Sequence, residues 1–219
     1  RSGSVTGVQT CALPILTVGY TTDYGRFVSA TSYFDHASFD TEDGSEILNA
    51  IFEQSPPVPG VLRAHDDDEV FSQEFRFSSS FDGPLQLTTG LYFQDSKTNT
   101  VFPPSPMPPI SDNLYTLDLQ QKVKETALFA EANYDLTERL TLIAGLRYFD
   151  NEVTFSQLQG GLFGDQVPYE GEQQQSGVTP KVGVQYHLND DRMIYANAGK
   201  GYRVGGVNGF AAGACAHRF

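Results

Sequence analysis

Apolar and polar residues alternate with a period of two along most of this chain, which predicts strands rather than helices. In residues 85–94, leucines and a phenylalanine alternate with glutamine, threonine, glycine and tyrosine, and residues 139–150 and 178–188 repeat the pattern. Two apolar residues, Phe129 and Ile143, fall on the polar set. From residue 16 onward the alternation predicts about eight strands: 16–22, 26–37, 69–80, 85–96, 123–134, 139–150, 176–188 and 192–203.

The predicted connections are alternately short and long. The short ones have the polar and glycine residues of tight turns. The long ones have about 25–30 residues, so the plan is typical of an outer-membrane barrel with short periplasmic turns and long extracellular loops. The turns are expected at 24–25, 81–84, 135–138 and 189–191, and the loops at 38–68, 97–122 and 151–175.

Alternation alone does not say which face of the sheet contacts water. A soluble sandwich or a lipocalin-like barrel would direct the apolar set into a core, whereas a membrane barrel would direct it to lipid. The polar set is rich in Gly, Thr and Gln with scattered charges, and aromatic residues gather at strand ends. A hydrated lumen and an interfacial girdle account for both features, so we favour the membrane barrel.

Composition supports an all-β chain and excludes several other classes. Sixteen Phe and eleven Tyr suit a pleated sheet, and twenty-one Gly and twelve Pro suit its turns. No apolar run is long enough for a transmembrane helix. A formal net charge of -13 argues against nucleic-acid binding. The two cysteines, Cys11 and Cys215, lie near the chain ends, and we predict no disulfide framework.

Three motifs resemble, in turn, a metal site, a proline-rich peptide ligand and a phosphate-binding loop, and we adopt none of these interpretations. "HDDDE" at 65–69 lacks the spacing of a calcium loop and is expected to be a solvated stretch at the end of a loop. "PPSPMPP" at 103–109 is expected to be a stiff extracellular loop in polyproline II geometry. "GKGYRVGGVNG" at 199–209 lacks phosphate-loop spacing. We predict no catalytic, cofactor-binding or metal site, and no enzyme.

Three longer strings carry a resemblance to a known family. Residues 73–93 ("QEFRFSSSFDGPLQLTTGLYF"), 127–152 ("ALFAEANYDLTERLTLIAGLRYFDNE") and 177–209 ("GVTPKVGVQYHLNDDRMIYANAGKGYRVGGVNG") resemble the barrel of TonB-dependent outer-membrane receptors. The resemblance implies a 22-stranded barrel in the outer membrane of a Gram-negative bacterium. It also implies an N-terminal plug domain and import of a scarce ligand, such as a ferric siderophore, driven through TonB.

The expected fold is therefore a partial transmembrane antiparallel β-barrel, about eight strands of those 22. Its partners would be the lipid bilayer and, in the full-length protein, a plug domain, TonB and a siderophore-like ligand. Such an open sheet has two unpaired edges, so this polypeptide alone would not be a competent transporter. Candidate lumen-facing residues, for ligand passage or plug contact, are Glu74, Arg76, Glu131, Arg147 and Lys181.

Two alternatives remain at this point. A complete eight-stranded outer-membrane barrel with a structural or adhesion role would require pairing between the strands at 16–22 and 192–203. A soluble ligand-binding β-domain would require the leucines and valines to pack against a second sheet.

The ends of the chain depart from this pattern. "VTGVQTCALPI" at 5–15 lacks the charged start and apolar run of a signal peptide, and it looks like a translated sequencing adapter. We therefore expect residues 1–15 to be a non-native, poorly packed leader. The partial barrel would cover 16–209, and residues 210–219 would be an atypical or truncated end.

Overall fold

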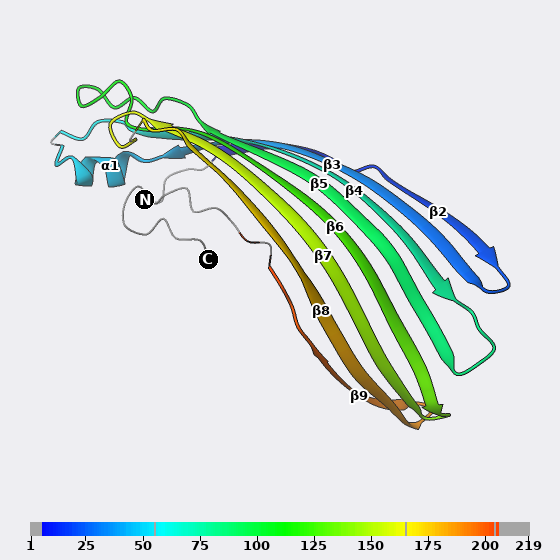
Figure 1. The fold of residues 1–219 in the computed structure, drawn as a ribbon. Helices are drawn as coiled ribbons and strands as arrows, with labels where there is room; N and C mark the ends of the chain where they lie inside the picture. The colour runs from blue at the N-terminus through cyan, green and yellow to red at the C-terminus, as the bar shows by residue number, and fades with distance from the viewer. Residues whose placement is uncertain (1–5, 55, 165, 204, 206–219) are drawn as a thin grey trace.

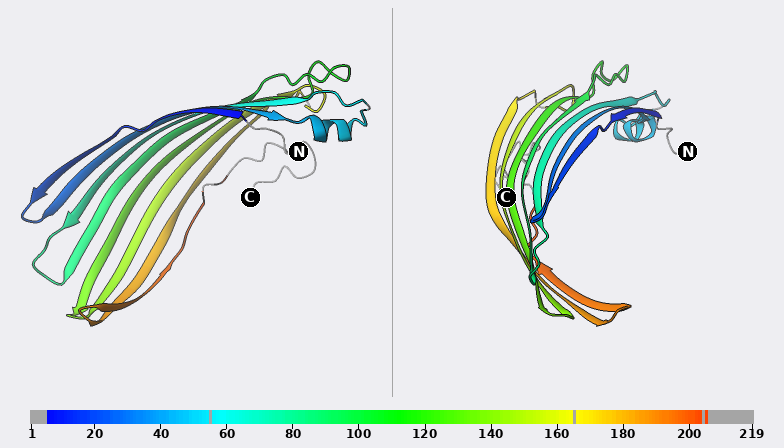
Figure 2. Two further views of the ribbon diagram at one scale, coloured as in Figure 1. Left: turned by 180° about the vertical axis from the view of Figure 1, so that it is seen from behind. Right: turned by 90° about the vertical axis from the view of Figure 1, so that its right-hand side faces the viewer.

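The computed structural model describes residues 6–54, 56–164, 166–203 and 205. In this part of the chain, nine strands form one antiparallel sheet that curves into an open trough (Figures 1 and 2). The prediction of an all-β fold is confirmed. The strands are β1 (Thr6–Ala12), β2 (Ile15–Thr22), β3 (Gly25–Asp43), β4 (Val61–Ser79), β5 (Leu85–Phe102), β6 (Thr116–Thr137), β7 (Leu140–Gly160), β8 (Tyr169–Asn189) and β9 (Arg192–Gly199), and one helix, α1 (Ser45–Ile51), follows β3.

From β3 to β9 each strand pairs with the next one along the chain. Both β1 and β2 pair with the free edge of β3, while β9 forms the opposite edge. Within the described residues these two edges do not pair, and the end-on view in Figure 2 shows an arc rather than a ring. The alternative of a complete eight-stranded barrel is therefore wrong, and the prediction of a partial barrel is confirmed.

Side chains of opposite parity occupy the two faces of the sheet. The chain after β9, orange-red in Figure 1, runs along the concave side, and its Tyr202 stacks on Phe149 of β7. Odd-numbered residues of β7 therefore face the concave side, and even-numbered residues such as Leu146 face the convex side. Because paired residues share a face, this assignment extends by register to every neighbouring strand.

The convex face carries an apolar band at the same level on neighbouring strands. In β7 the band runs from Leu140 to Tyr148, a span of nine residues. No second sheet among the described residues covers the band, and most of its side chains are exposed, so the soluble sandwich is also wrong. Its members on β5 to β8 include Leu85, Leu87, Leu91, Phe93, Leu128, Tyr134, Leu142, Leu146, Tyr148, Val178, Val182, Val184 and Tyr186.

The strands continue well past this band, which corrects the expected loop lengths. Residues 38–43, 61–68, 97–102, 116–122, 151–160 and 169–175 were expected in loops but extend the strands. Both faces of these extensions are largely polar, so hydrophobic alternation disappears while backbone pairing persists. Four short turns join the strands as expected, but two of them are shifted from the predicted positions, to 23–24 and 138–139, and β9 ends at Gly199 rather than at residue 203.

The segment that was expected to be a poorly packed leader contributes a strand to the edge of the sheet. Thr6–Ala12 pairs with Asp35–Thr41 in the register that β2 continues beyond Pro14, whose carbonyl oxygen accepts a hydrogen bond from the Tyr33 N–H (3.1 Å). The side chains of residues 7–12 are exposed, and Cys11 is a free thiol. The non-native origin of residues 1–15 and the boundary at residue 16 stay predictions. Residues 210–219 lie outside the described residues.

Three connections at the far end of the strands pack together into what we call the loop cap, the described residues of 44–60, 103–115 and 161–168. Leu48 of α1, Met107 and Leu114 are buried together. Phe52 contacts Phe163 with ring centroids 5.6 Å apart, and the N–H groups of Leu162 and Phe163 donate to carbonyl oxygens of residues 113 and 114. The proline-rich segment is thus folded around a buried methionine rather than extended as polyproline II.

The first turn of α1 is held by the end of β3. The Ser45 N–H donates to Asp43 Oδ1 (3.0 Å). Hydrogen bonds from the side chain and the N–H of Ser45 hold the pKa of Asp43 below its ordinary value. Among the described residues, no helix is long and apolar enough to cross a membrane.

Large side chains on the concave face lie over glycines of the neighbouring strand. Phe129 is the direct partner of Gly90, and Phe149 is the direct partner of Gly177. A Cβ on Gly90 would lie 2.5 Å from the Phe129 ring and 2.5 Å from the Phe75 carbonyl oxygen. The two apolar exceptions to the alternation are explained in this way, since Ile143 is likewise the partner of Gly183.

Replacing Gly90 by alanine is expected to destabilise the sheet by about 1–3 kcal/mol, because the new methyl group overlaps both a ring and a backbone oxygen. Gly199→Ala is the matched control on the same face, where the nearest atom to a new Cβ is 3.5 Å away. Urea-induced unfolding in detergent micelles measures both. Equal losses for the two variants would contradict this account of the glycines.

Candidate functional site

The structure places all five predicted lumen residues on the concave face. Glu74 and Arg76 are neighbours on β4, with 3.6 Å between Oε1 and Nη1. Glu131 of β6 and Lys181 of β8 form an ion pair of 2.8 Å across the intervening strand. Gly145 of β7 is the register partner of both residues, so no side chain separates the carboxylate from the ammonium group.

The fifth predicted residue, Arg147, belongs to a cluster that also contains residues the prediction omitted. Its guanidinium pairs with Glu125 of β6 and lies 5.4 Å from the ring centroid of Tyr92 on β5. The Glu125 side chain is 11 % exposed, the least exposed of the charged groups in the ion pairs. Alternation carried the signal for Glu125, because it shares its parity with Glu131 in the same predicted strand.

An aromatic stack closes one side of this cluster. The Tyr202 ring is parallel to the Phe149 ring (interplanar angle 7°, centroids 3.7 Å apart). Asn151, two residues further along the same face of β7, is nearly fully buried. A shallow hollow of about 330 Å³ adjoins the cluster, with Arg147 and Lys181 in its lining. No pattern in the sequence predicted that the segment after β9 would lie across the sheet in this way.

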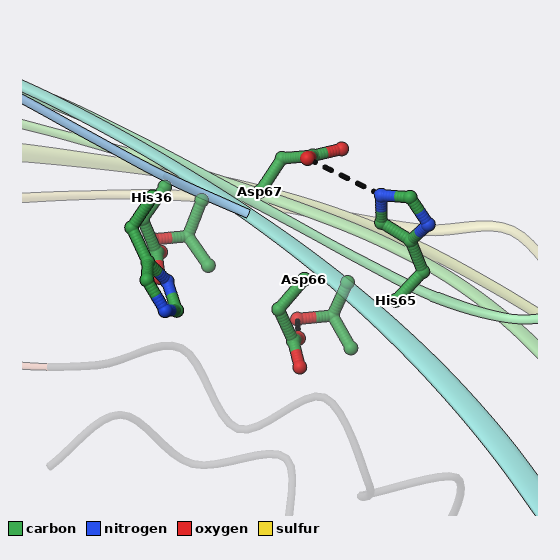
Figure 3. A network of polar contacts seen from close by, with 7 residues as sticks. His36, His65, Asp66 and Asp67 are labelled. Atoms are coloured by element: carbon green, nitrogen blue, oxygen red, sulfur yellow. Dashed lines mark hydrogen bonds and ion pairs between the residues drawn. The ribbon is translucent and has the colours of Figure 1, made fainter. Parts of the chain in front are cut away.

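The acidic motif at 65–69 lies within β4 rather than at the end of a loop, and the strand divides its side chains between the two faces. Figure 3 shows His65 and Asp67 on one side of the ribbon and Asp66 on the other, with His36. His65 pairs with Asp67 at 3.2 Å, and the Thr100 hydroxyl donates to Asp66 at 2.5 Å. Asp68 accepts from Thr98 and lies 3.5 Å from His36. The described residues contain no group of three or more His, Cys, Asp or Glu side chains that could hold a metal ion.

The concave face is therefore a wall of paired charges, amides and aromatic rings. Such groups can hydrogen-bond a polar surface laid against them. Each charged side chain can also replace its ion-pair partner by a ligand group of the same charge as that partner.

Removing the charge of Glu125 is expected to cost more stability than removing that of Glu131. Glu125→Gln leaves Arg147 beside a poorly hydrated amide and should cost about 1–3 kcal/mol. Glu131→Gln breaks a pair whose side chains are 34 % and 48 % exposed, so water screens the loss to about 0–1 kcal/mol. Urea-induced unfolding of both variants at low and high salt measures the difference. A larger loss for Glu131→Gln would contradict the ranking.

Comparison with known proteins adds evidence that is independent of this geometry. A search of curated proteins finds no match to the sequence. Among solved structures, the chain resembles the ferric yersiniabactin uptake receptor FyuA from Yersinia pestis, with a TM-score of 0.73 and 17 % identity over 86 % of this chain and 27 % of that one. It also resembles the siderophore receptor PiuA from Acinetobacter baumannii, with a TM-score of 0.69 and 14 % identity over 87 % of this chain and 32 % of that one.

The chain thus spans about a third or less of the length of these two receptors, and at such low identity the likeness concerns the fold. The family profile described as "TonB dependent receptor-like, beta-barrel" matches residues 10–216, nearly the whole sequence. That match begins ahead of the boundary expected at residue 16. By this match and by its open antiparallel sheet, the chain belongs to the TonB-dependent receptor β-barrel family.

Proposed function

We propose that this chain forms part of the wall of an outer-membrane receptor that takes up a scarce ligand, a ferric siderophore, with energy delivered through TonB. The observation that carries the proposal is the apolar band of the convex face. Its upper limit falls at one level on three strands, because Leu128, Tyr148 and Val178 form one register row, and on β5 it lies one row higher, at Phe93. Polar residues take over in the next row, at Thr126, Asp150 and Ser176.

The height of the band supports a membrane location. A strand that crosses a bilayer at the usual tilt needs about 9–11 residues. The band of β7 covers nine residues, and that of β8, from Val178 to Leu188, covers eleven. Tyrosines lie at both limits, Tyr148 above and Tyr134 and Tyr186 below, as expected of side chains at a membrane interface.

The concave face supports a polar interior. The ion pairs of Glu131 with Lys181 and of Glu125 with Arg147 lie behind the apolar band or at its upper limit. In hydrocarbon these charges would be costly, whereas a water-filled lumen or the surface of a plug domain would hydrate or pair them. We therefore propose that Glu74, Arg76, Glu131, Arg147 and Lys181 line the lumen, for ligand passage or plug contact.

The two free edges of the sheet support the proposed partners. An unpaired edge strand leaves its backbone groups without partners in lipid, so β1, β2 and β9 require further strands to complete a barrel. A plug domain, TonB and an iron-loaded siderophore complete the proposal, by analogy with the two receptors named above. We propose no enzymatic activity.

The full-length gene product is expected to restore the uptake of iron from a ferric siderophore. The test introduces it into a Gram-negative strain that lacks its own siderophore receptors and measures uptake of radioactive iron from a panel of ferric siderophores. Uptake should require a functional TonB, and the same strain without TonB is the control. Absence of uptake for every siderophore, with the barrel correctly inserted, would contradict the proposed ligand class.

An arginine placed at the middle of the apolar band tests the membrane location separately. Leu146→Arg is expected to destabilise the barrel in phospholipid vesicles by about 2–4 kcal/mol, because the charge would lie in hydrocarbon. Ser156→Arg is the matched control on the same face of β7, above the band, and should cost about 0–1 kcal/mol. Urea titration in vesicles measures both, and equal costs would contradict a bilayer at this level.

A further inference from the structure

Above the level of Arg147, the inner wall of the trough carries no charge on four neighbouring strands. This upper inner wall is formed by the inward residues of 96–102 on β5, 117–123 on β6, 153–159 on β7 and 169–173 on β8, which have hydroxyl, amide, aliphatic and aromatic side chains and include one glycine. The charged residues of these segments all face outward, and they are Lys97, Asp118, Lys122, Glu170 and Glu172. Charge is therefore separated strictly between the two faces of these segments, in a chain whose net charge is -13.

Four glutamines supply amide groups to the upper inner wall. Gln121 lies on β6, Gln157 and Gln159 lie on β7, and Gln173 lies on β8. Within the described part of the chain, the side-chain hydrogen bonds do not involve any of these four amide groups, although Gln157 is only 6 % exposed. A side-chain amide both donates and accepts hydrogen bonds and carries no charge. The wall thus offers hydrogen-bonding groups to a molecule in the trough, and it offers them without a net charge.

The two strands beside this wall add negative charge to the same face. Figure 3 shows Asp66 on the opposite side of β4 from Asp67. The inward carboxylates of β3 and β4 at this height are those of Asp40, Glu42, Asp66 and Asp68. Above Arg147, the described inward positions of β3 to β8 contain no lysine or arginine, and Arg203, after β9, is one cation against those four carboxylates. A polyanion in the trough would therefore meet like charges here without a matching set of cations.

We propose that the ligand of this receptor is an electrically neutral ferric complex of the hydroxamate class, and that the upper inner wall discriminates against ferric catecholates. The inference rests on the uptake of a ferric siderophore proposed above and specifies its chemical class. Three hydroxamate groups, each with a single negative charge, neutralise the ferric ion completely. Three catecholate groups, each with two negative charges, leave the complex strongly anionic.

The two classes of complex differ in what they gain and lose at the wall. A neutral complex with amide or carbonyl groups at its surface can exchange hydrogen bonds with the four glutamines, and it is not repelled by Asp66 and Asp68. An anionic complex would be repelled by those carboxylates, and a cleft of one sign of charge between low-dielectric walls strengthens the repulsion. Discrimination therefore comes from repulsion of the wrong class as well as from hydrogen bonds to the right one.

The first test compares ligand classes on the full-length receptor in dodecyl maltoside micelles. Equilibrium dialysis with radioactive iron measures the binding of neutral ferric trihydroxamates such as ferrichrome, of ferric enterobactin, an anionic tricatecholate, and of ferric citrate. The best-bound trihydroxamate is expected to bind at least about tenfold more tightly than ferric enterobactin at low salt. Tighter binding of ferric enterobactin, or binding of ferric citrate alone, would overturn this inference and leave the proposed siderophore uptake standing. A folded receptor that binds none of these complexes would contradict the proposed function itself.

Consecutive glutamines on the two faces of the sheet provide variants with a matched control. Gln121→Lys/Gln173→Lys places two cations on the upper inner wall and is expected to strengthen the binding of ferric enterobactin by about 5- to 10-fold at low salt, with a smaller gain at high salt. Gln120→Lys/Gln174→Lys makes the same change one residue away on the outer face and should alter this binding by less than about twofold. Heat-modified mobility in electrophoresis checks that both variants are folded. Equal gains in the two pairs of substitutions, or no gain in the inward pair, would overturn the role of the wall.

Discussion

Register along the continuous ladders from β3 to β8 is the constraint on which the rest of this structure depends. A shift by one residue in any ladder would exchange the two faces of that strand, placing Arg147 in the apolar band and Leu146 against the ion pairs. The pairing of β6 with β7, for example, runs without a shift from Thr116 to Asp135 before a bulge at the turn. The band and the wall of paired charges are therefore two results of a single register.

Glycines on the concave face make that wall possible. Gly145 lets the Glu131 carboxylate reach Lys181 from two strands away, while Gly90 and Gly177 give Phe129 and Phe149 room to lie flat. Curvature crowds side chains on this face, so the smallest residue next to a large one is a packing solution rather than a weak point in the strand. The polar set looked glycine-rich in the sequence for this reason.

Sequence alternation located eight of the strands because in those segments one face was apolar. The strand segments and the contact that alternation did not predict were missed for identifiable reasons. Above the band both faces are polar, so Asp66, Asp67 and Asp68 resembled a loop although backbone pairing continues through them. Pro14 concealed a strand whose register continues on either side of it. The stack of Tyr202 on Phe149 joins residues 53 positions apart, and no local pattern encodes such a contact.

The three connections of the loop cap share one core, so their sequences cannot change independently of one another. Met107 and Leu114 come from one connection, Leu48 from a second, and Phe163, which contacts Phe52, from a third. A substitution that alters the volume of any one of them changes the support of the other two. The three connections therefore form one evolutionary unit, in which a tolerated change in one segment calls for compensation in another. An antibody raised against any single segment as a free peptide would meet a different shape on the folded protein.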